Sequence, residues 1–236
     1  MSNQTIKIKS SWSLSKLSPG IYSFLNLASI TSAFDSNEKI LSQIQFYCDG
    51  GLLSKLISIL TTEKIRRVSF DFTSIADEIF KYCESNDKTI YFVGAEQKEV
   101  TKFVSKIMTN YPSLKIAGYH NGYFKNSTAL ADKINDLNVD FVVAGLGAGR
   151  QETFLFELLE RKFKGIGFSC GGFIRQFAES KSETYYPYII NKLKLRGFYR
   201  MYKEPHTIKR YFLDYPKNII LLPLKVYTRK IIIKLV

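Results

Sequence analysis

The amino-acid sequence predicts an α/β fold: a Rossmann-like, mostly parallel sheet with flanking helices, followed by a basic helical C-terminal appendage. Three observations support this expectation. Short apolar runs alternate with longer amphipathic stretches along most of the chain. Several of the apolar runs lead directly into glycine, as strands do before the ligand-binding turns of open α/β sheets. The formal net charge of +13 is concentrated at the C-terminal end.

Each predicted element follows from its own pattern. Six short apolar runs bounded by glycine or polar residues predict strands at 22–27, 44–48, 89–93, 114–118, 141–145 and 165–169. Between them, apolar residues recur three and four positions apart, which predicts helices at 54–61, 75–83, 96–109, 127–135 and 151–163. In the third of these helices Val100, Phe103, Val104 and Ile107 share one face.

The length and composition predict one folded core with an appendage. The 236 residues are 45% hydrophobic, which excludes a disordered or collagen-like chain. We expect an α/β core over residues 1–186 and a basic, membrane-associating appendage over 187–236, because KSETYYP interrupts the pattern just before the basic segment. Three isolated cysteines and two distant histidines argue against a disulfide framework or a Cys/His zinc site.

The basic segment predicts the environment of the protein. Residues 192–236 hold twelve Lys and Arg against Glu204 and Asp214 alone, a surplus of ten positive charges. Short apolar runs alternate with these cations, which favours an anionic membrane surface. A basic helix packed on its own domain is the alternative, and nucleic acid is not expected because no binding motif is recognisable. No secretory signal or run of about 18 apolar residues is present, so the cytoplasm is the expected compartment.

The glycine-rich stretch DFVVAGLGAGRQE, residues 140–152, is the clearest motif. With Gly145 and Gly147 as its first pair, a dinucleotide fingerprint would place its third glycine at position 150, which is Arg150. A nicotinamide cofactor is therefore not expected. The backbone N–H groups of this turn could still hold a nucleotide diphosphate, with Arg150 or Gln151 beside it. The alternative is a tight turn that needs glycine for packing alone.

The motifs VGA, GYHNGYF, DFVVAGLGAGRQE and FYRMYKEPHTIKRYF together resemble, in order and spacing, the WecG/TagA/CpsF family, glycosyltransferase family 26. The resemblance extends from about residue 22 to 212. It implies inverting transfer of a sugar, N-acetylmannosamine-type or hexose, from a UDP-sugar to a polyprenyl-diphosphate-linked sugar. Such transfer serves bacterial surface polysaccharide synthesis at the cytoplasmic face of the membrane. The resemblance implies neither a metal nor another cofactor.

Asp49 is the expected general base. The family's Asp-Gly pair resembles Asp49-Gly50 in QFYCDGGL. An aspartate just beyond an apolar strand lies at the carboxyl edge of the sheet, where it could accept the proton of an attacking hydroxyl. The alternative is a turn-forming Asp-Gly, which is common between a strand and a helix.

The resemblance also implies ligand-binding residues in the core. Arg66 keeps the five-residue spacing to Asp71 of the family's RVTGSDL element, with Arg67 as the alternative phosphate ligand. Asn26 matches the family's TLN strand end, although Phe24 replaces its threonine. In the glycine motifs and the helix that follows, the expected donor- or acceptor-binding residues are Asn121, Gly122, Gly145, Gly147 and Gln151.

Some positions depart from the family pattern. Asn121 stands where the family has aspartate, so an amide replaces a carboxylate. We expect Glu152 to serve the structure of its helix through the macrodipole. In the C-terminal segment Arg200 and Arg210 match two of three family arginines, and Thr207 replaces the third. The resemblance implies that this segment folds over the active site near the membrane and brings its arginines to the diphosphates. Gly197 replaces the tryptophan of the family's EW pair.

Three readings of the function remain open. The first is the glycosyltransferase itself. The second is a non-catalytic family member that binds and activates a partner glycosyltransferase, so a partner enzyme or a second copy of the chain is an expected partner. The third is a module that binds acidic lipid or nucleic acid through the C-terminal segment alone. The donor sugar cannot be read from these residues.

Overall fold

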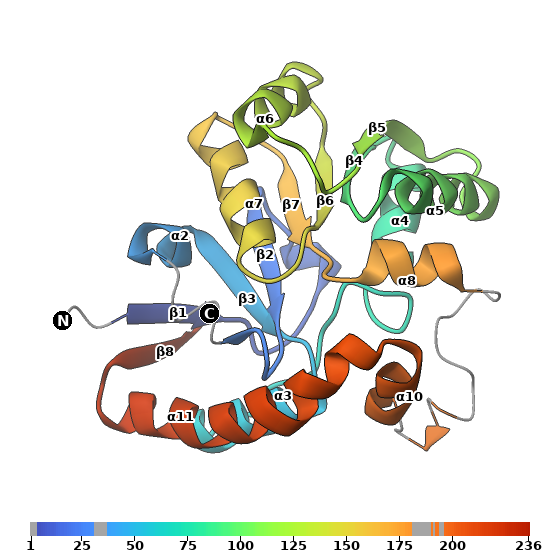
Figure 1. Ribbon diagram of the computed structural model, residues 1–236. Helices are drawn as coiled ribbons and strands as arrows, with labels where there is room; N and C mark the ends of the chain where they lie inside the picture. Colours follow the sequence, from blue (N-terminus) through green and yellow to red (C-terminus); the bar gives the residue numbers. More distant parts are fainter. Residues whose placement is uncertain (1–3, 31–36, 181–189, 191, 194–195) are drawn as a thin grey trace.

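The computed structural model describes residues 4–30, 37–180, 190, 192–193 and 196–236. Eight strands form one sheet in the order β5-β4-β6-β7-β2-β3-β1-β8, and every neighbouring pair is parallel (Figure 1). The strands are β1 (Gln4–Ile8), β2 (Gly20–Leu25), β3 (Ile44–Cys48), β4 (Thr89–Gly94), β5 (Lys115–His120), β6 (Phe141–Gly145), β7 (Ile166–Ser169) and β8 (Ile231–Leu235).

Helices cover both faces of the sheet. They are α2 (Glu38–Gln43), α3 (Gly51–Thr61), α4 (Ala76–Ser85), α5 (Gln97–Asn110), α6 (Ser127–Asp136), α7 (Arg150–Glu160), α8 (Phe173–Glu179), α10 (Arg196–Lys203) and α11 (Tyr215–Tyr227), with short turns η1 (Leu14–Lys16), η2 (Pro205–Thr207) and η3 (Arg210–Asp214). One hydrophobic cluster joins the strands to α2, α3, α6, α7 and α11. The other cluster, rich in aromatic rings, joins them to α4, α5 and α8.

The predicted fold class is confirmed: the six expected strands and five expected helices all form, with ends shifted by at most three residues. Strand interiors alternate between the two clusters. In β4, for example, Ile90 and Phe92 belong to one cluster, and Tyr91 and Val93 to the other. This alternation is the two-residue period of a strand that is buried on both faces.

Sequence analysis did not anticipate β1 and β8, which are neighbours at one edge of the sheet. All five residues of β8 are in register with β1, and Ile231 is buried. The C-terminal segment therefore contributes a strand to the same sheet as the core, in addition to its helices. The expected boundary between residues 186 and 187 lies outside the described residues.

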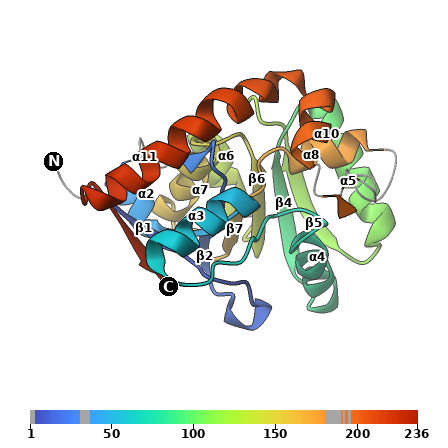
Figure 2. The same ribbon diagram turned by 90° about the horizontal axis from the view of Figure 1, so that it is seen from below.

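Helix α11 is attached to the core beside α3 (Figure 2). Leu222 is buried in the hydrophobic cluster of that side. The buried Asn218 donates a hydrogen bond from Nδ2 to the carbonyl of Leu27, which follows β2, at 2.7 Å. Among the described residues, no helix is long and apolar enough to cross a bilayer.

Candidate active site

A cavity of about 1510 Å³ lies where several parallel strands end. Its walls come from the segments that follow β2, β3, β4, β6 and β7, and from the C-terminal residues 197–215. In open α/β sheets ligands bind at this carboxyl edge. The C-terminal segment makes the site deeper than the sheet edge alone, because residues of α10, η3 and α11 form one wall of it.

Asp49 follows β3 directly and lines this cavity. Its backbone N–H donates to the carbonyl of Leu25 at the end of β2, which continues the pairing of β2 with β3 by one residue. The next residue, Gly50, has φ +121°, a conformation that side chains disfavour, and α3 begins immediately after it. The strand end and this turn fix Asp49 at the edge of the sheet, with its side chain 33% exposed.

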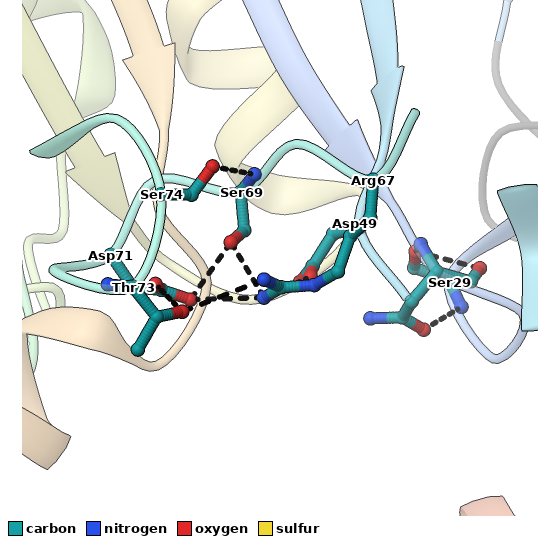
Figure 3. Close-up of polar contacts among 8 residues, drawn as sticks. Ser29, Asp49, Arg67, Ser69, Asp71, Thr73 and Ser74 are labelled. Atoms are coloured by element: carbon teal, nitrogen blue, oxygen red, sulfur yellow. Dashed lines mark hydrogen bonds and ion pairs between the residues drawn. The ribbon is translucent and has the colours of Figure 1, made fainter. Parts of the chain in front are cut away.

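Arg67 bridges Asp49 and Asp71 (Figure 3). Its Nη2 lies 3.1 Å from Asp49 Oδ1 and 3.2 Å from Asp71 Oδ2, and donates to Ser69 Oγ at 2.6 Å. Burial disfavours the charged guanidinium, but the two carboxylates outweigh it and raise the pKa of Arg67. One permanent cation therefore holds two carboxylates.

Asp71 is further held by its own loop. Its Oδ2 accepts from Ser69 Oγ at 2.9 Å, and its Oδ1 accepts from the backbone N–H of Thr73 at 2.7 Å and from the Thr73 hydroxyl. Ser74 Oγ in turn accepts from the N–H of Ser69 (Figure 3). With Asp71 fixed in this way, its ion pair with Arg67 helps to hold the guanidinium beside Asp49.

The glycine turn between β6 and α7 forms the floor of the cavity. A Cβ on Gly145 would lie 2.8 Å from the carbonyl oxygen of Gly171, so the close approach of these two loops requires glycine. Gly147 has open space around it but φ +84°, so here the backbone conformation requires glycine. Close packing therefore requires glycine at position 145 and backbone conformation requires it at position 147, while the role of this turn as a ligand cradle stays a prediction.

Gln151, in the first turn of α7, is only 4% exposed and lines the cavity. Its Oε1 accepts from the N–H of Gly171 at 3.2 Å, and its Nε2 donates to Glu152 at 3.0 Å. Arg150 reaches across the turn and donates to the carbonyl of Gly122 at 3.0 Å. The turn after β6, the loop after β5 and the loop after β7 are thereby tied together.

Cys170 also lines the cavity, but it is not a nucleophile at neutral pH. Burial raises the pKa of its thiol to about 12, so the group stays protonated. Among the described residues, no group of three or more His, Cys, Asp or Glu side chains is arranged to hold a metal ion. That the reaction needs no metal or other cofactor stays a prediction.

The C-terminal wall is attached to the core through Glu204. The buried carboxylate of Glu204 accepts from Arg175 Nη2 at 3.1 Å and from Gln176 Nε2 at 3.0 Å, both on α8. Thr207, where the resemblance leads one to expect an arginine, is also buried and donates from Oγ1 to the Glu204 carbonyl at 2.7 Å. In this chain position 207 therefore stabilises the wall from inside.

The structure brings most of the expected site residues to one cavity. Its lining includes Asn26, Asp49, Gly122, Gly145, Gly147, Gln151 and Arg210. Asn26 caps its own turn, accepting from the N–H groups of Ala28 and Ser29. Gly197 lines the cavity as well, whereas the side chain of Arg200 lies outside the described residues.

Two expected residues lie apart from the cavity lining. Arg66 is exposed, and its backbone N–H donates to the carbonyl of Ser10. Asn121 accepts from the N–H of Tyr123 and donates to Gln97. Arg67 occupies the position expected of Arg66. The signal was present in the sequence, because Arg67-Val68 keeps the Arg-Val pair of RVTGSDL when one residue before Asp71 is deleted.

A strand-end carboxylate and a glycine turn share one cavity at the carboxyl edge of the sheet, which is where open-sheet α/β proteins bind their ligands. The model of the Glycosyl transferase WecG/TagA/CpsF family matches residues 4–231. The chain belongs to this family, and it is a glycosyltransferase.

Curated relatives agree with this assignment. The UDP-Gal:alpha-D-GlcNAc-diphosphoundecaprenol beta-1,4-galactosyltransferase of Shigella boydii is 33% identical over 204 residues, 85% of this chain and 84% of the relative. The N-acetylglucosaminyldiphosphoundecaprenol N-acetyl-beta-D-mannosaminyltransferase of Bacillus subtilis (strain 168) is 30% identical over 75% of this chain and 68% of its own length. The enzyme of the same name from Bacillus spizizenii is 26% identical over 77% and 69%.

Proposed function

We propose that this glycosyltransferase moves a hexose or N-acetylhexosamine from a UDP-sugar to N-acetylglucosamine on a polyprenyl diphosphate, in cell-surface polysaccharide synthesis. The observation that carries the proposal is Asp49, a partly exposed carboxylate held at the edge of a large cavity by Arg67. The named relatives support the acceptor, since each acts on a diphosphoundecaprenol-linked N-acetylglucosamine. Their names differ in the sugar transferred, so we leave the donor sugar to experiment.

The proposed chemistry is a single displacement. Asp49 accepts the proton of the acceptor hydroxyl while that oxygen forms a bond to the anomeric carbon of the donor. The bond from the anomeric carbon to the UDP oxygen breaks, and UDP leaves with its electron pair. Attack on the face opposite UDP inverts the anomeric centre, which fits the beta linkages in the relatives' names.

The leaving diphosphate needs nearby donors, and the cavity provides them. The turn between β6 and α7 places backbone N–H groups at a helix N-terminus, where phosphates are stabilised. Arg210 on the C-terminal wall lines the same cavity. Arg67 supplies a second cationic group beside the proposed base. The volume of this cavity exceeds that of a typical small-molecule site. We therefore expect it to accommodate the donor and the acceptor together.

We further propose that the C-terminal wall is the surface that contacts the membrane, at its cytoplasmic face. This surface carries cations and exposed apolar residues, namely Phe198, Tyr202, Ile208, Phe212 and Leu213. Helix α11 adds the exposed Ile220 and Leu224 beyond the wall. Phe198 and Phe212 also line the cavity, so the apolar surface continues to its opening. A lipid-linked acceptor could therefore present its diphosphate to the cavity while its chain stays in the bilayer.

The test of the proposed function is transfer from a panel of labelled UDP-sugars, with UDP-galactose and UDP-N-acetylmannosamine first, to N-acetylglucosamine diphosphate on a polyprenyl chain. Product with one donor, with an inverted anomeric configuration by NMR, is expected. Retained configuration would contradict the single displacement. Absence of product with every donor, in the presence of anionic vesicles, would contradict the proposed substrates.

A further inference from the structure

We propose that Glu152 is a positioning residue that fixes the side-chain amide of Gln151 in the orientation used for substrate binding. This inference rests on the proposed function and on the place of Gln151 in the lining of the cavity, where it is expected to bind substrate. It goes beyond the helix-capping role that the sequence suggests for Glu152. It rests on the hydrogen bonds around a carboxylate that is buried at the first turn of α7.

The Glu152 carboxylate accepts three hydrogen bonds. Its Oε1 accepts from Ser23 Oγ at 2.6 Å and from Gln151 Nε2 at 3.0 Å, and its Oε2 accepts from the N–H of Gly149 at 2.7 Å. Within the described parts of the chain, no Lys or Arg forms an ion pair with it. A buried carboxylate without a cation is stabilised by such donors and by the positive end of the helix dipole.

The directions of these hydrogen bonds follow from two backbone N–H groups, which can only donate, and from the Glu152 carboxylate, which accepts. The Phe24 N–H donates to Ser169 Oγ at 3.2 Å, and the Gly171 N–H donates to Gln151 Oε1. Ser23 uses its only proton for Glu152, so the 2.9 Å contact between Ser23 Oγ and Ser169 Oγ has Ser169 as the donor. The hydrogen bonds therefore point toward Glu152 from the Ser23 side and from the Gln151 side, and the Glu152 carboxylate is their common acceptor.

Only an acceptor with no proton satisfies this arrangement. If position 152 were glutamine with its oxygen toward Gly149, its NH₂ would face Gln151 Nε2. The Gln151 amide would then have to flip, and its NH₂ would face the N–H of Gly171. If the glutamine were reversed, its NH₂ would face the N–H of Gly149. Either orientation leaves two donors opposed in a buried site, which is costly.

The amide orientation matters because Gln151 lines the cavity. Once its Oε1 serves Gly171 and one Nε2 hydrogen serves Glu152, the second Nε2 hydrogen remains. Glu152 thereby determines which group of Gln151 is offered to a sugar hydroxyl or phosphate oxygen. In a flipped amide the NH₂ would face the N–H of Gly171, and the oxygen would take the place of the N–H that is offered to the ligand.

The first test is independent of donor sugar and of turnover. The side-chain NH₂ signal of Gln151 is assigned in a ¹⁵N–¹H spectrum as the pair that is lost in Gln151→Met. We expect this signal to shift or broaden in Glu152→Gln and to stay in place in Glu160→Gln, a matched change at a more exposed position of the same helix. An unchanged Gln151 signal in Glu152→Gln would overturn the proposal, whether or not the proposed substrates are correct.

The second test uses transfer kinetics. In the wild-type background, Glu152→Gln is expected to lower kcat/KM at least about tenfold. In a Gln151→Met background the same change should lower kcat/KM by less than about twofold further, because the two substitutions remove the same substrate contact. Equal losses in both backgrounds would overturn the proposal. If the wild type transfers from none of the donors, the proposed function fails, while the NMR result still decides the positioning role.

A swapped double variant, Gln151→Glu with Glu152→Gln, separates positioning from folding. Its buried pair is satisfied again, because the carboxylate now at position 151 accepts from the N–H of Gly171 and from the amide at position 152. The oxygen of that amide accepts from the N–H of Gly149. We expect its thermal stability to exceed that of Glu152→Gln, while transfer stays low because the side chain at position 151 has no N–H group left. Wild-type transfer by the swapped variant would show that Glu152 serves structure only.

Discussion

At the scale of the residue, the ion pair between Asp49 and Arg67 is the feature on which the proposed catalysis depends. An aspartate after a buried strand could be recognised from the sequence, because such positions lie at the carboxyl edge of a sheet. The sequence offered a signal for each arginine, because Arg66 keeps the five-residue spacing to Asp71 and Arg67 keeps the Arg-Val pair. The choice between Arg66 and Arg67 is made only by the fold. It depends on an isolated parallel bridge between Cys48 and Arg67, which turns Arg67 toward Asp49 and leaves Arg66 exposed. Adjacent side chains on extended backbone point to opposite sides. A shift of one residue therefore decides which arginine pairs with Asp49 and which is exposed to solvent.

Arg67→Ala should reduce transfer much more than Arg66→Ala. Removing Arg67 leaves Asp49 and Asp71 without the cation they share and takes a donor from the cavity. We expect kcat/KM to fall by about 10²-fold or more, as for loss of a preorganised donor. Arg66→Ala, which removes an exposed side chain, should stay within about twofold of wild type in the same assay. The reverse ranking would show that Arg66 binds the ligand.

At the scale of the element, the core strands and helices were predictable because each carries its own periodicity. Strand β8 was not, since the apolar run IIIKL is equally compatible with an interfacial strip and only its pairing with β1 makes it a strand. The cavity wall was implied by the family resemblance but not by any local periodicity. It depends on Glu204 meeting two side chains of α8, and no local pattern in the sequence encodes that contact.

Asp140 links β6 to β4 and gives a pH-dependent prediction. It accepts from the N–H and hydroxyl of Thr89 and pairs with Lys88. Burial opposes ionisation, but these hydrogen bonds and the Lys88 charge outweigh it and lower the pKa of Asp140. Its stabilisation is therefore present above the ordinary carboxyl pKa and is lost as the pH falls through the lowered value.

Asp140→Asn should consequently destabilise the fold by about 1 kcal/mol at neutral pH. This corresponds to a Tm about 2–4 °C lower for a chain of this size. The difference from wild type should shrink as the pH approaches the acid range, which thermal unfolding across pH would show. A difference that grows on acidification would contradict the assigned pKa direction.

Glu204→Ala should loosen the C-terminal wall. The change leaves Arg175 and Gln176 without their buried acceptor, so α10 and η2 lose a fixed contact with α8. We expect faster limited proteolysis within residues 196–215 and lower transfer, with amide hydrogen exchange in β4 and β6 unaffected. Glu179→Ala is the matched control, because Glu179 is an exposed glutamate on α8, the helix that carries Arg175 and Gln176. Unchanged proteolysis in Glu204→Ala would show that other contacts hold the wall.

At the scale of the whole molecule, the C-terminal segment does three things at once. It extends the sheet through β8, packs α11 beside α3, and forms one wall of the cavity while exposing apolar side chains outward. The sequence indicated its charge and amphipathic character. That the same segment lies over the site was implied by the resemblance alone. The contacts that place it there, such as the one between Asn218 and Leu27, join residues 191 positions apart in sequence.

Replacing the exposed pair Phe212 and Leu213 by serine should weaken binding to vesicles that contain anionic lipid. Both side chains are more than half exposed, so their loss should leave thermal unfolding nearly unchanged. Sedimentation with vesicles, with Leu137→Ser as the control for an exposed leucine on the core, measures the effect. Binding should also weaken with added salt, because cations contribute to it. Equal binding by wild type and the double variant would exclude this surface.

The central claim is that Asp49 is the base of a sugar transfer, and one measurement addresses it most directly. Transfer from the active UDP-sugar to polyprenyl-diphosphate N-acetylglucosamine should be compared between wild type, Asp49→Asn and Asp136→Asn, an exposed control on α6. Asp49→Asn should keep the fold and lose about 10²–10⁴-fold in kcat, with the control unchanged. Transfer by Asp49→Asn within about threefold of wild type would contradict the account.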